Sequence, residues 1–458
     1  MPDELYFSSL TSLAGAIAAR EVSSVELTTS YLERIDKVNP PLNAVVQLAA
    51  ERALDEAREA DAALARGESR GPLHGVPMTI KDSLDTAGVI STGGTKGRAS
   101  FVPERDATVV SRLRDAGAIL LGKTNTPELT LSFETNNVIY GRTNNPYDVS
   151  RSPGGSSGGA AAILAAGGSP FDVGSDYGGS IRLPSHCCGI AGIKPTSGRV
   201  PRTGHVYPFG GVLDSFQQIG PLARYVDDLA LLLPILSGPD WIDPMIVPLP
   251  LRDPRNVKIA GLRVAFHTDN GILAPTAETA GTTRAAARAL EAAGAHVEEV
   301  RPTAIEQSYE IVMGLWAADG GARTRSLLAA AGTDETSLGA DAPEPLSAEA
   351  REALHQRWDA LRSTMLSWFK SWDAILCPVN AAPALPHGES MGPGITRFSY
   401  TMTYNLVGWP AAVVRGGTSP EGLPIGVQVV TRPWREDVAL AVAKQLEGTL
   451  GGFRAPPI

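Results

Sequence analysis

Two serine clusters flanked by glycine are the most informative feature of this chain. SPGGSSGG occupies residues 152–159 and GSDYGGSIR occupies residues 174–182, with a short apolar segment between them. Glycines on both sides of a serine let backbone N–H groups approach one atom closely, which is the arrangement that an oxyanion requires. This stretch therefore indicates a serine hydrolase whose nucleophile is activated without histidine.

Two other motifs point to different functions. GAILLGKT at 117–124 satisfies the phosphate-loop pattern, but large apolar residues separate its glycines and Pro127 disfavours the helix that should follow. We interpret this segment as a buried strand.

GGSSG at 154–158 matches the nucleophile elbow of α/β-hydrolases, with Ser156 as the nucleophile. That esterase-like alternative stays open, although it leaves SDYGGSIR without a role. Its catalytic histidine would come from six candidates in undistinguished settings: His186, His205, His267, His296, His355 and His387.

Composition narrows the possible partners and compartments. The chain has 458 residues, a net charge of −9 and no long run of Lys or Arg, so nucleic acid and anionic membranes are disfavoured as partners. Cys187, Cys188 and Cys377 are too few for a disulfide framework and lack the spacing of a metal site. The N-terminus has no signal-peptide pattern. We expect a cytoplasmic protein with reduced thiols and no metal.

The secondary-structure signals alternate between helix and strand, which favours a layered α/β fold. The helix from 23 to 36 opens with a capping box made by Ser23 and Glu26. Further helices are predicted at 51–66, 108–116, 158–166, 276–293 and 347–372. Buried strands are predicted at AILLGK, FDVG, RVAF, AILCPV, AAVV and GVQVV.

The chain resembles the amidase signature family through four motifs in the family's order. They are GVPMTIKD at 75–82, SPGGSSGG at 152–159, GSDYGGSIRLP at 174–184 and GIKPTSGRVPR at 192–202. Looser similarity in the flanking segments extends the resemblance over most of the chain. It implies one domain over residues 1–458 with a signature core at about 75–202. The implied α/β fold has a large mixed β-sheet covered on both faces by helices.

The resemblance also implies a Ser-Ser-Lys triad. Ser180 matches the nucleophile, Ser156 the bridging serine held in a cis peptide, and Lys81 the terminal base. The chemistry is consistent, because a serine hydroxyl is a weak nucleophile until a base accepts its proton. A lysine is such a base only when its surroundings lower its pKa. The apolar segment VPMTI before Lys81 would bury it.

Residues next to the nucleophile complete the expected site. The oxyanion would be bound by backbone N–H groups of Tyr177, Gly178, Gly179 and Ser180. Thr130 matches a position whose carbonyl faces the substrate. Asp176 and Arg182 are expected to form an ion pair that holds the loop, and this structural role is favoured over a chemical one. Ser157 is expected to support the triad, to cap the following helix, or both.

Some features of the chain depart from the family pattern. Ser175 stands where the family has threonine, and the unusual SHCC at 185–188 favours packing, rather than chemistry, for Cys187 and Cys188. The E-A-S-S-N-L segment of amidotransferase subunits is missing from residues 308–328. Six apolar residues could line a pocket, although a core position is favoured for such side chains: Tyr207, Phe209, Phe216, Met313, Leu315 and Trp316.

Together these features predict an amidase that hydrolyses linear amide C–N bonds through a Ser180 acyl-enzyme, without a cofactor. The substrate is expected to be a small apolar or aromatic amide, an anilide or an aryl carbamate, the last making the enzyme a urethanase. A glutaminase or amidotransferase-type subunit is the main alternative. The oligomeric state stays open, with a homodimer as one option.

Overall fold

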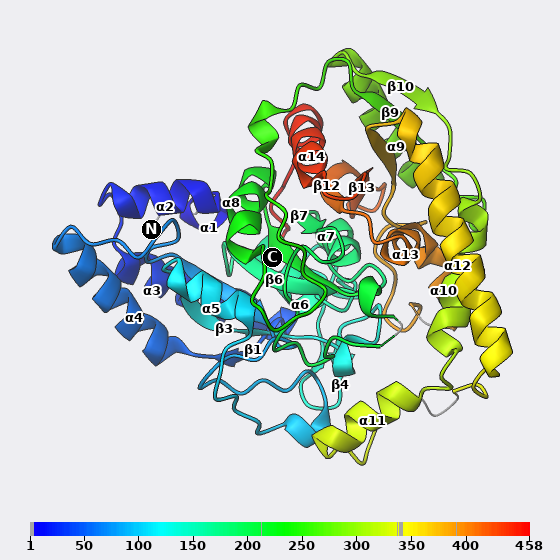
Figure 1. The fold of residues 1–458 in the computed structure, drawn as a ribbon. Coiled ribbons are helices and arrows are strands. Elements are labelled where there is room, and N and C mark those ends of the chain that lie inside the picture. The colour runs from blue at the N-terminus through cyan, green and yellow to red at the C-terminus, as the bar shows by residue number, and fades with distance from the viewer. Residues whose placement is uncertain (1–3, 212, 337, 339–341, 391) are drawn as a thin grey trace.

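The computed structural model describes residues 4–211, 213–336, 338, 342–390 and 392–458. Its largest sheet has eight strands in the order β10-β9-β11-β13-β12-β7-β8-β6 (Figure 1). The three strands at the β10 end of this order pair in parallel and the others pair antiparallel, so the sheet is mixed. The strands are β6 (Phe171–Asp176), β7 (Ala191–Lys194), β8 (Gln218–Ala223), β9 (Arg263–Phe266), β10 (His296–Glu299), β11 (Ala374–Pro378), β12 (Ala411–Thr418) and β13 (Pro424–Thr431).

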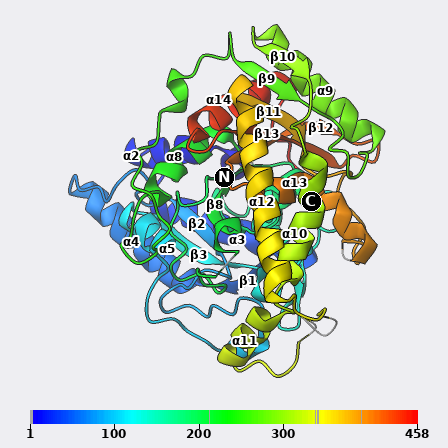
Figure 2. The same ribbon diagram turned by 45° about the vertical axis from the view of Figure 1, so that its right-hand side comes forward.

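Helices cover both faces of this sheet, as the sequence predicts. Side chains alternate along β11, so that Leu376 packs in one apolar cluster while Ile375 and Cys377 pack in another. The first cluster includes residues of α8 (Val226–Leu236), α9 (Ala277–Ala292) and α14 (Glu436–Leu450). The second includes residues of α6 (Gly158–Ala165), α7 (Arg182–Cys188), α10 (Ser308–Ala317), α12 (Ala348–Trp368) and α13 (Ser399–Leu406). Helices α10 and α12 run side by side along the outside (Figure 2).

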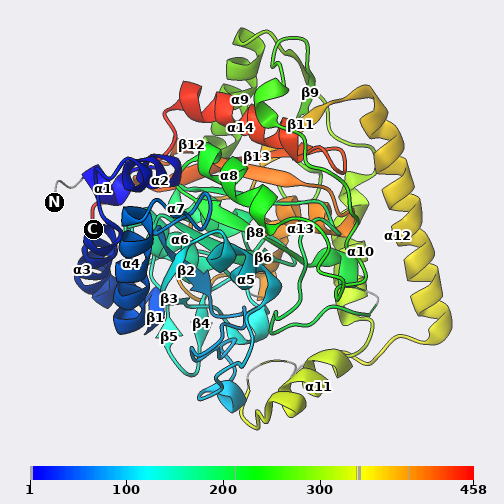
Figure 3. The ribbon, with the colours of Figure 1, turned by 60° about the vertical axis from the view of Figure 1, so that its left-hand side comes forward.

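A second sheet contains β1 (Val45–Leu48), β3 (Ile119–Thr124) and β2 (Pro77–Lys81) in that order. Asp172 of β6 connects it to the main sheet, because this buried carboxylate accepts hydrogen bonds from Thr79 Oγ1 at 2.7 Å and Thr124 Oγ1 at 3.0 Å. Strands β2 and β6 therefore lie next to each other (Figure 3). This contact brings Lys81 at the end of β2 close to the second serine cluster.

The remaining elements surround these sheets. They are α1 (Glu4–Phe7), α2 (Leu10–Ala18), α3 (Ser24–Leu42), α4 (Ala50–Ala65), α5 (Thr108–Asp115), α11 (Ala322–Ala331), β4 (Asn136–Asn137) and β5 (Gly141–Arg142). The helices and strands predicted from sequence all form, with ends shifted by a few residues. Within the described residues, no helix combines the length and apolar character needed to cross a lipid bilayer.

Two local signals act as expected. Ser23 and Glu26 form the capping box at the start of α3. The phosphate-loop look-alike forms the buried strand β3, and the ammonium group of Lys123 donates within the protein to Thr86 Oγ1 at 2.6 Å. This segment is thus a buried part of the fold, in agreement with our interpretation.

Candidate active site

Lys81 ends β2 and is completely buried. Its Nζ atom lies 2.6 Å from Ser156 Oγ, 2.9 Å from Ser157 Oγ and 3.1 Å from Ser175 Oγ. The lysine therefore contacts two neighbouring hydroxyls of the first serine cluster and one hydroxyl from the end of β6. Ser156 Oγ is hydrogen-bonded to an amine, and among the described residues no hydrogen bond joins it to a histidine, which the esterase-like alternative would require.

The surroundings of Lys81 favour its neutral form. Burial lowers the pKa of Lys81 to about 7, although the negative charges of Asp176 and Asp172 act in the opposite direction. The loss of hydration disfavours the ammonium ion more than these two carboxylates stabilise it. A substantial fraction of Lys81 is consequently able to accept a proton near neutral pH.

The first serine cluster is held tightly against its neighbours. The peptide bond between Gly155 and Ser156 is cis, as the resemblance implies. A Cβ atom on Gly155 would lie 2.7 Å from the backbone of Glu134, so a side chain cannot fit there. Ser157 donates its N–H to the carbonyl of Ser180 at 3.2 Å, which ties the two clusters together.

Ser157 supports the lysine and does not cap α6. Its hydroxyl donates to the backbone carbonyl of Ser175 at 3.3 Å and lies against Lys81 Nζ. It occupies the N-cap position of α6, but its side chain makes no capping hydrogen bond. Of the two roles expected for Ser157, the capping role by its side chain is therefore wrong.

Ser180 lies on the loop between β6 and α7, at a cavity of about 440 Å³. Ser180 is 5% exposed, and Thr130, Tyr177 and Gly178 line the same cavity. Within the described residues, no acceptor is hydrogen-bonded to the backbone N–H groups of Gly178, Gly179 or Ser180. Donors left unpaired at a cavity are what an oxyanion site requires.

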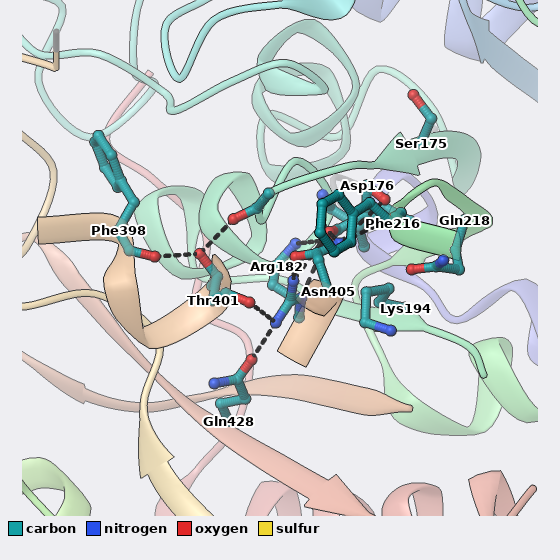
Figure 4. A network of polar contacts seen from close by, with 12 residues as sticks. Ser175, Asp176, Arg182, Lys194, Phe216, Gln218, Phe398, Thr401, Asn405 and Gln428 are labelled. Atoms are coloured by element: carbon teal, nitrogen blue, oxygen red, sulfur yellow. Dashed lines mark hydrogen bonds and ion pairs between the residues drawn. The ribbon is translucent and has the colours of Figure 1, made fainter. Parts of the chain in front are cut away.

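The loop that carries Ser180 is fixed by a buried ion pair (Figure 4). Arg182 donates from Nε and Nη2 to the two oxygens of Asp176 at 3.0 and 2.9 Å. Both side chains are fully buried, which confirms the expected pair. Burial alone would raise the pKa of Asp176, but the charge and hydrogen bonds of Arg182 hold it at about 2. Asn405 adds a hydrogen bond to Asp176 at 2.8 Å.

α13 closes the other side of the loop. Thr401 donates its hydroxyl to the carbonyl of Gly178 at 2.7 Å, and its own carbonyl accepts from Arg182 Nη1 at 3.0 Å (Figure 4). Gly179 adopts a φ of +141°, and a Cβ atom there would lie 2.4 Å from Thr401 Oγ1. The loop thus depends on glycine both for its conformation and for its contact with α13.

Aromatic side chains form much of the cavity wall. Trp316 stacks on Tyr177 with ring centroids 5.9 Å apart, and Phe133 stacks on Phe398 at 4.1 Å. Of the six apolar residues considered from sequence, Tyr207, Leu315 and Trp316 line this cavity. Phe216 is buried behind Tyr177, in the core position favoured for it, and Phe209 and Met313 do not line the cavity.

Comparisons with known proteins show the family of this chain. The family model described as Amidase matches residues 26–440. The chain is 36% identical to a glutamyl-tRNA(Gln) amidotransferase subunit of Moorella thermoacetica, over 99% of each chain. It is 34% identical to an acylamidase of Rhodococcus erythropolis, over 97% of this chain and 95% of that one. A solved structure of 6-aminohexanoate cyclic dimer hydrolase superposes with a TM-score of 0.88 at 30% identity, over 99% of each chain.

The chain belongs to the amidase family. Its fold is the amidase signature fold, and it is an amide-cleaving hydrolase. In this amidase-family protein, Lys81 is hydrogen-bonded to Ser156 and Ser157, and Ser157 is bonded to the carbonyl of Ser180. Asp176 pairs with Arg182, and one cavity is lined by Thr130, Tyr177, Gly178 and Ser180.

Sequence reasoning named His205 only as one of six undistinguished histidines and missed its place in this amidase-family site. His205 is buried, and its Nε2 atom lies 2.9 Å from Ser175 Oγ. Its Nδ1 atom lies 2.7 Å from Gln217 Nε2 and 3.0 Å from the carbonyl of Tyr207. Burial, reinforced by the charge of Lys81, lowers the pKa of His205 to about 3, so its imidazole is neutral. The segment TGHVY carries no sequence signal for such a contact.

The unusual SHCC segment serves packing, as expected. Cys187 and Cys188 are buried in the apolar cluster around α7, and burial raises the pKa of Cys187 to about 12. His186 is also buried, where its Nδ1 accepts a hydrogen bond from the N–H of Gly426 at 2.9 Å. These groups stay uncharged near neutral pH and make contacts within the fold.

Proposed function

We propose that this protein hydrolyses linear amides through an acyl-enzyme formed on Ser180. One observation carries the proposal: the fully buried Lys81, with its pKa near 7, lies 2.6 Å from Ser156 Oγ. Ser156 is followed by Ser157, whose N–H is bonded to the carbonyl of Ser180. A neutral base, a relay hydroxyl and a nucleophile hydroxyl are thereby present in one small region of the fold.

In the proposed reaction, Ser180 Oγ attacks the amide carbonyl while its proton passes to Ser156, whose own proton passes to Lys81. The unpaired N–H groups of Gly178, Gly179 and Ser180 bind the oxyanion that develops. Return of the proton through Ser156 to the nitrogen lets the amine leave. Water then attacks the acyl-enzyme by the same route in reverse and releases the acid.

The aromatic cavity supports a substrate with an apolar or aromatic body. Tyr177, Trp316 and Phe133 offer flat faces on which a ring can stack. The acylamidase name of the Rhodococcus relative is consistent with an amide or anilide substrate. An aryl carbamate has a similar shape, so urethanase activity is part of the proposal.

A glutaminase-type subunit is the second candidate. It is favoured by the 36% identity to the Moorella amidotransferase protein. The E-A-S-S-N-L segment is absent here, and Leu315 and Trp316 of the replacing segment line the cavity. Hydrolysis of glutamine at a higher kcat/KM than any anilide would favour this second function.

We further propose a cytoplasmic location, small-molecule partners only and, as an option, a homodimer.

A panel of anilides, primary amides, esters and aryl carbamates, ranked by kcat/KM, tests the substrate class.

Ser180→Ala tests the nucleophile, and we expect turnover to fall by a factor of about 10⁴ or more. Ser185→Ala is the matched control, because this buried hydroxyl on α7 only donates to the carbonyl of Ile181 at 2.8 Å. Full activity in Ser180→Ala would refute the assignment.

A further inference from the structure

We propose that Arg323 and Tyr207 form a subsite for a carboxylate carried by the substrate, within the same cavity that Ser180 lines. The inference rests on the proposed amidase function and adds the substrate's charge to it. Both residues line the cavity, and both come from parts of the chain outside the four sequence motifs.

Arg323 brings a positive charge without a direct counter-ion into a mostly aromatic cavity. Its guanidinium lies 5.0 Å above the centroid of the Tyr207 ring, and its Nη2 donates to the carbonyl of Pro208 at 2.6 Å. Among the described residues, no carboxylate lies within 4.0 Å of this guanidinium, and its buried Nε has no partner. A partly desolvated cation of this kind is stabilised by an anion.

The two acids that share this cavity are occupied elsewhere. Asp319 accepts hydrogen bonds from the backbone N–H groups of Gly321 at 2.8 Å and Arg323 at 2.9 Å, at the start of α11. Asp214 accepts from Arg202 Nη1 at 2.5 Å and Nη2 at 3.0 Å. Each carboxylate therefore uses its oxygens on other donors, and the Arg323 side chain keeps N–H groups for a ligand.

The hydroxyl of Tyr207 adds a second donor. Burial raises the pKa of Tyr207, while the charge of Arg323 and the side-chain hydrogen bonds that Tyr207 makes with Arg323 and Tyr177 act in the opposite direction. Either phenol can be the donor between Tyr177 and Tyr207, and when Tyr177 donates, the Tyr207 O–H can turn to a ligand in the cavity that both residues line.

The chemistry of the subsite selects its ligand. A guanidinium and a phenol O–H are both donors, and they match a carboxylate through charge-assisted hydrogen bonds. The stacked rings of Tyr177 and Trp316 beside them suit an aromatic or apolar body. The substrate class that fits is an amide or anilide with a carboxylate on its acyl or its amine part.

Two matched pairs of compounds test this inference. One pair places the charge on the amine part: 4-acetamidobenzoate and its methyl ketone analogue. The other places it on the acyl part: 4-(phenylcarbamoyl)benzoate and its methyl ketone analogue. Dissociation constants are measured by calorimetry on Ser180→Ala, in which no turnover is expected, and kcat/KM is measured on the unchanged enzyme.

We expect the carboxylate of at least one pair to bind at least tenfold more tightly than its ketone, with a matching preference in kcat/KM. Arg323→Gln should reduce that preference at least tenfold, Arg323→Lys should retain part of it, and Tyr207→Phe should weaken it severalfold. Arg325→Gln is the matched control, because Arg325 lies on the same helix but donates to the carbonyl of Gly320 at 2.7 Å. It should leave the preference unchanged.

Equal affinity for carboxylate and ketone in both pairs, no binding of any of the four compounds, or an unchanged preference in Arg323→Gln would each overturn the subsite. The proposed function fails by a different result, which is turnover that persists in Ser180→Ala. The two failures are therefore distinguishable.

Discussion

The imidazole Nε2 of His205 lies 2.9 Å from the hydroxyl oxygen of Ser175, which in turn lies 3.1 Å from Nζ of Lys81. His205 is neutral, so it acts on the lysine through this hydroxyl and not through charge. By holding Ser175 Oγ in one place, the imidazole fixes one of the three contacts that orient the Lys81 amine. His205 is thus a positioning residue for the proposed base.

His205→Ala should lower kcat/KM by about 10- to 100-fold, because one buried hydrogen bond is worth about 1–3 kcal/mol. KM should change less than kcat, and His205→Gln should restore part of the rate. His186→Ala is the control, since this histidine is equally buried but bonds to Gly426 and Ala382. Equal losses of kcat/KM in His186→Ala and His205→Ala would show that His205 contributes only to stability.

The rate should depend on the protonation of Lys81. Since burial lowers its pKa to about 7, the neutral and active form predominates above that pH. We expect kcat/KM to rise tenfold per pH unit below about pH 7 and to level off above it. A pH-rate profile with a pH-stable amide measures this, and Lys81→Met should remove both the activity and the pH-dependent limb. A rate that rises only above pH 9 would contradict the assignment.

Asp176→Asn should destabilise the fold by about 3–5 kcal/mol, because it leaves the guanidinium of Arg182 buried beside an uncharged partner. The free energy of unfolding from urea titration measures the effect. The exposed pair of Asp253 and Arg255 gives the comparison, and Asp253→Asn should leave the free energy of unfolding nearly unchanged. Similar effects of the two substitutions would mean that the buried pair does not hold the loop.

Gly179→Ala should lower kcat by at least 100-fold, since the new Cβ atom would clash with Thr401 and displace the N–H groups that face the oxyanion. Gly210 also has a positive φ, of +110°, but a Cβ atom there would meet nothing within 4 Å. Gly210→Ala therefore separates backbone strain from steric contact and should retain most of the activity. Steady-state kinetics with a simple anilide compares the two variants.

Much of the fold could be predicted because its signals are local, and the core of the site because its motifs resemble those of a known family. The capping box of Ser23 and Glu26 marks the start of α3, and the apolar segment before Lys81 predicts the buried strand β2. The ion pair of Asp176 and Arg182 is separated by only six positions. In each case the residues that interact are close in sequence or belong to a motif.

The contacts of His205 and Arg323 depend on long-range folding and could not be predicted in this way. His205 forms an isolated backbone bridge with Leu84, three residues after Lys81, and this bridge brings its imidazole to Ser175. Arg323 reaches Tyr207 across more than one hundred residues. Neither pairing leaves a pattern in a single sequence. The order of strands in the main sheet is hidden for the same reason.

Part of the cavity wall described above comes from segments that follow the proposed triad in the sequence. The proposed base, relay and nucleophile lie between Lys81 and Ser180, whereas Tyr207, Trp316 and Arg323 of the wall come from later segments. Substitutions in the later segments would change which leaving group or acyl chain fits the cavity, while the residues proposed to transfer protons stay unchanged. A change at a few of these wall residues would therefore redirect the same proposed reaction to a different amide.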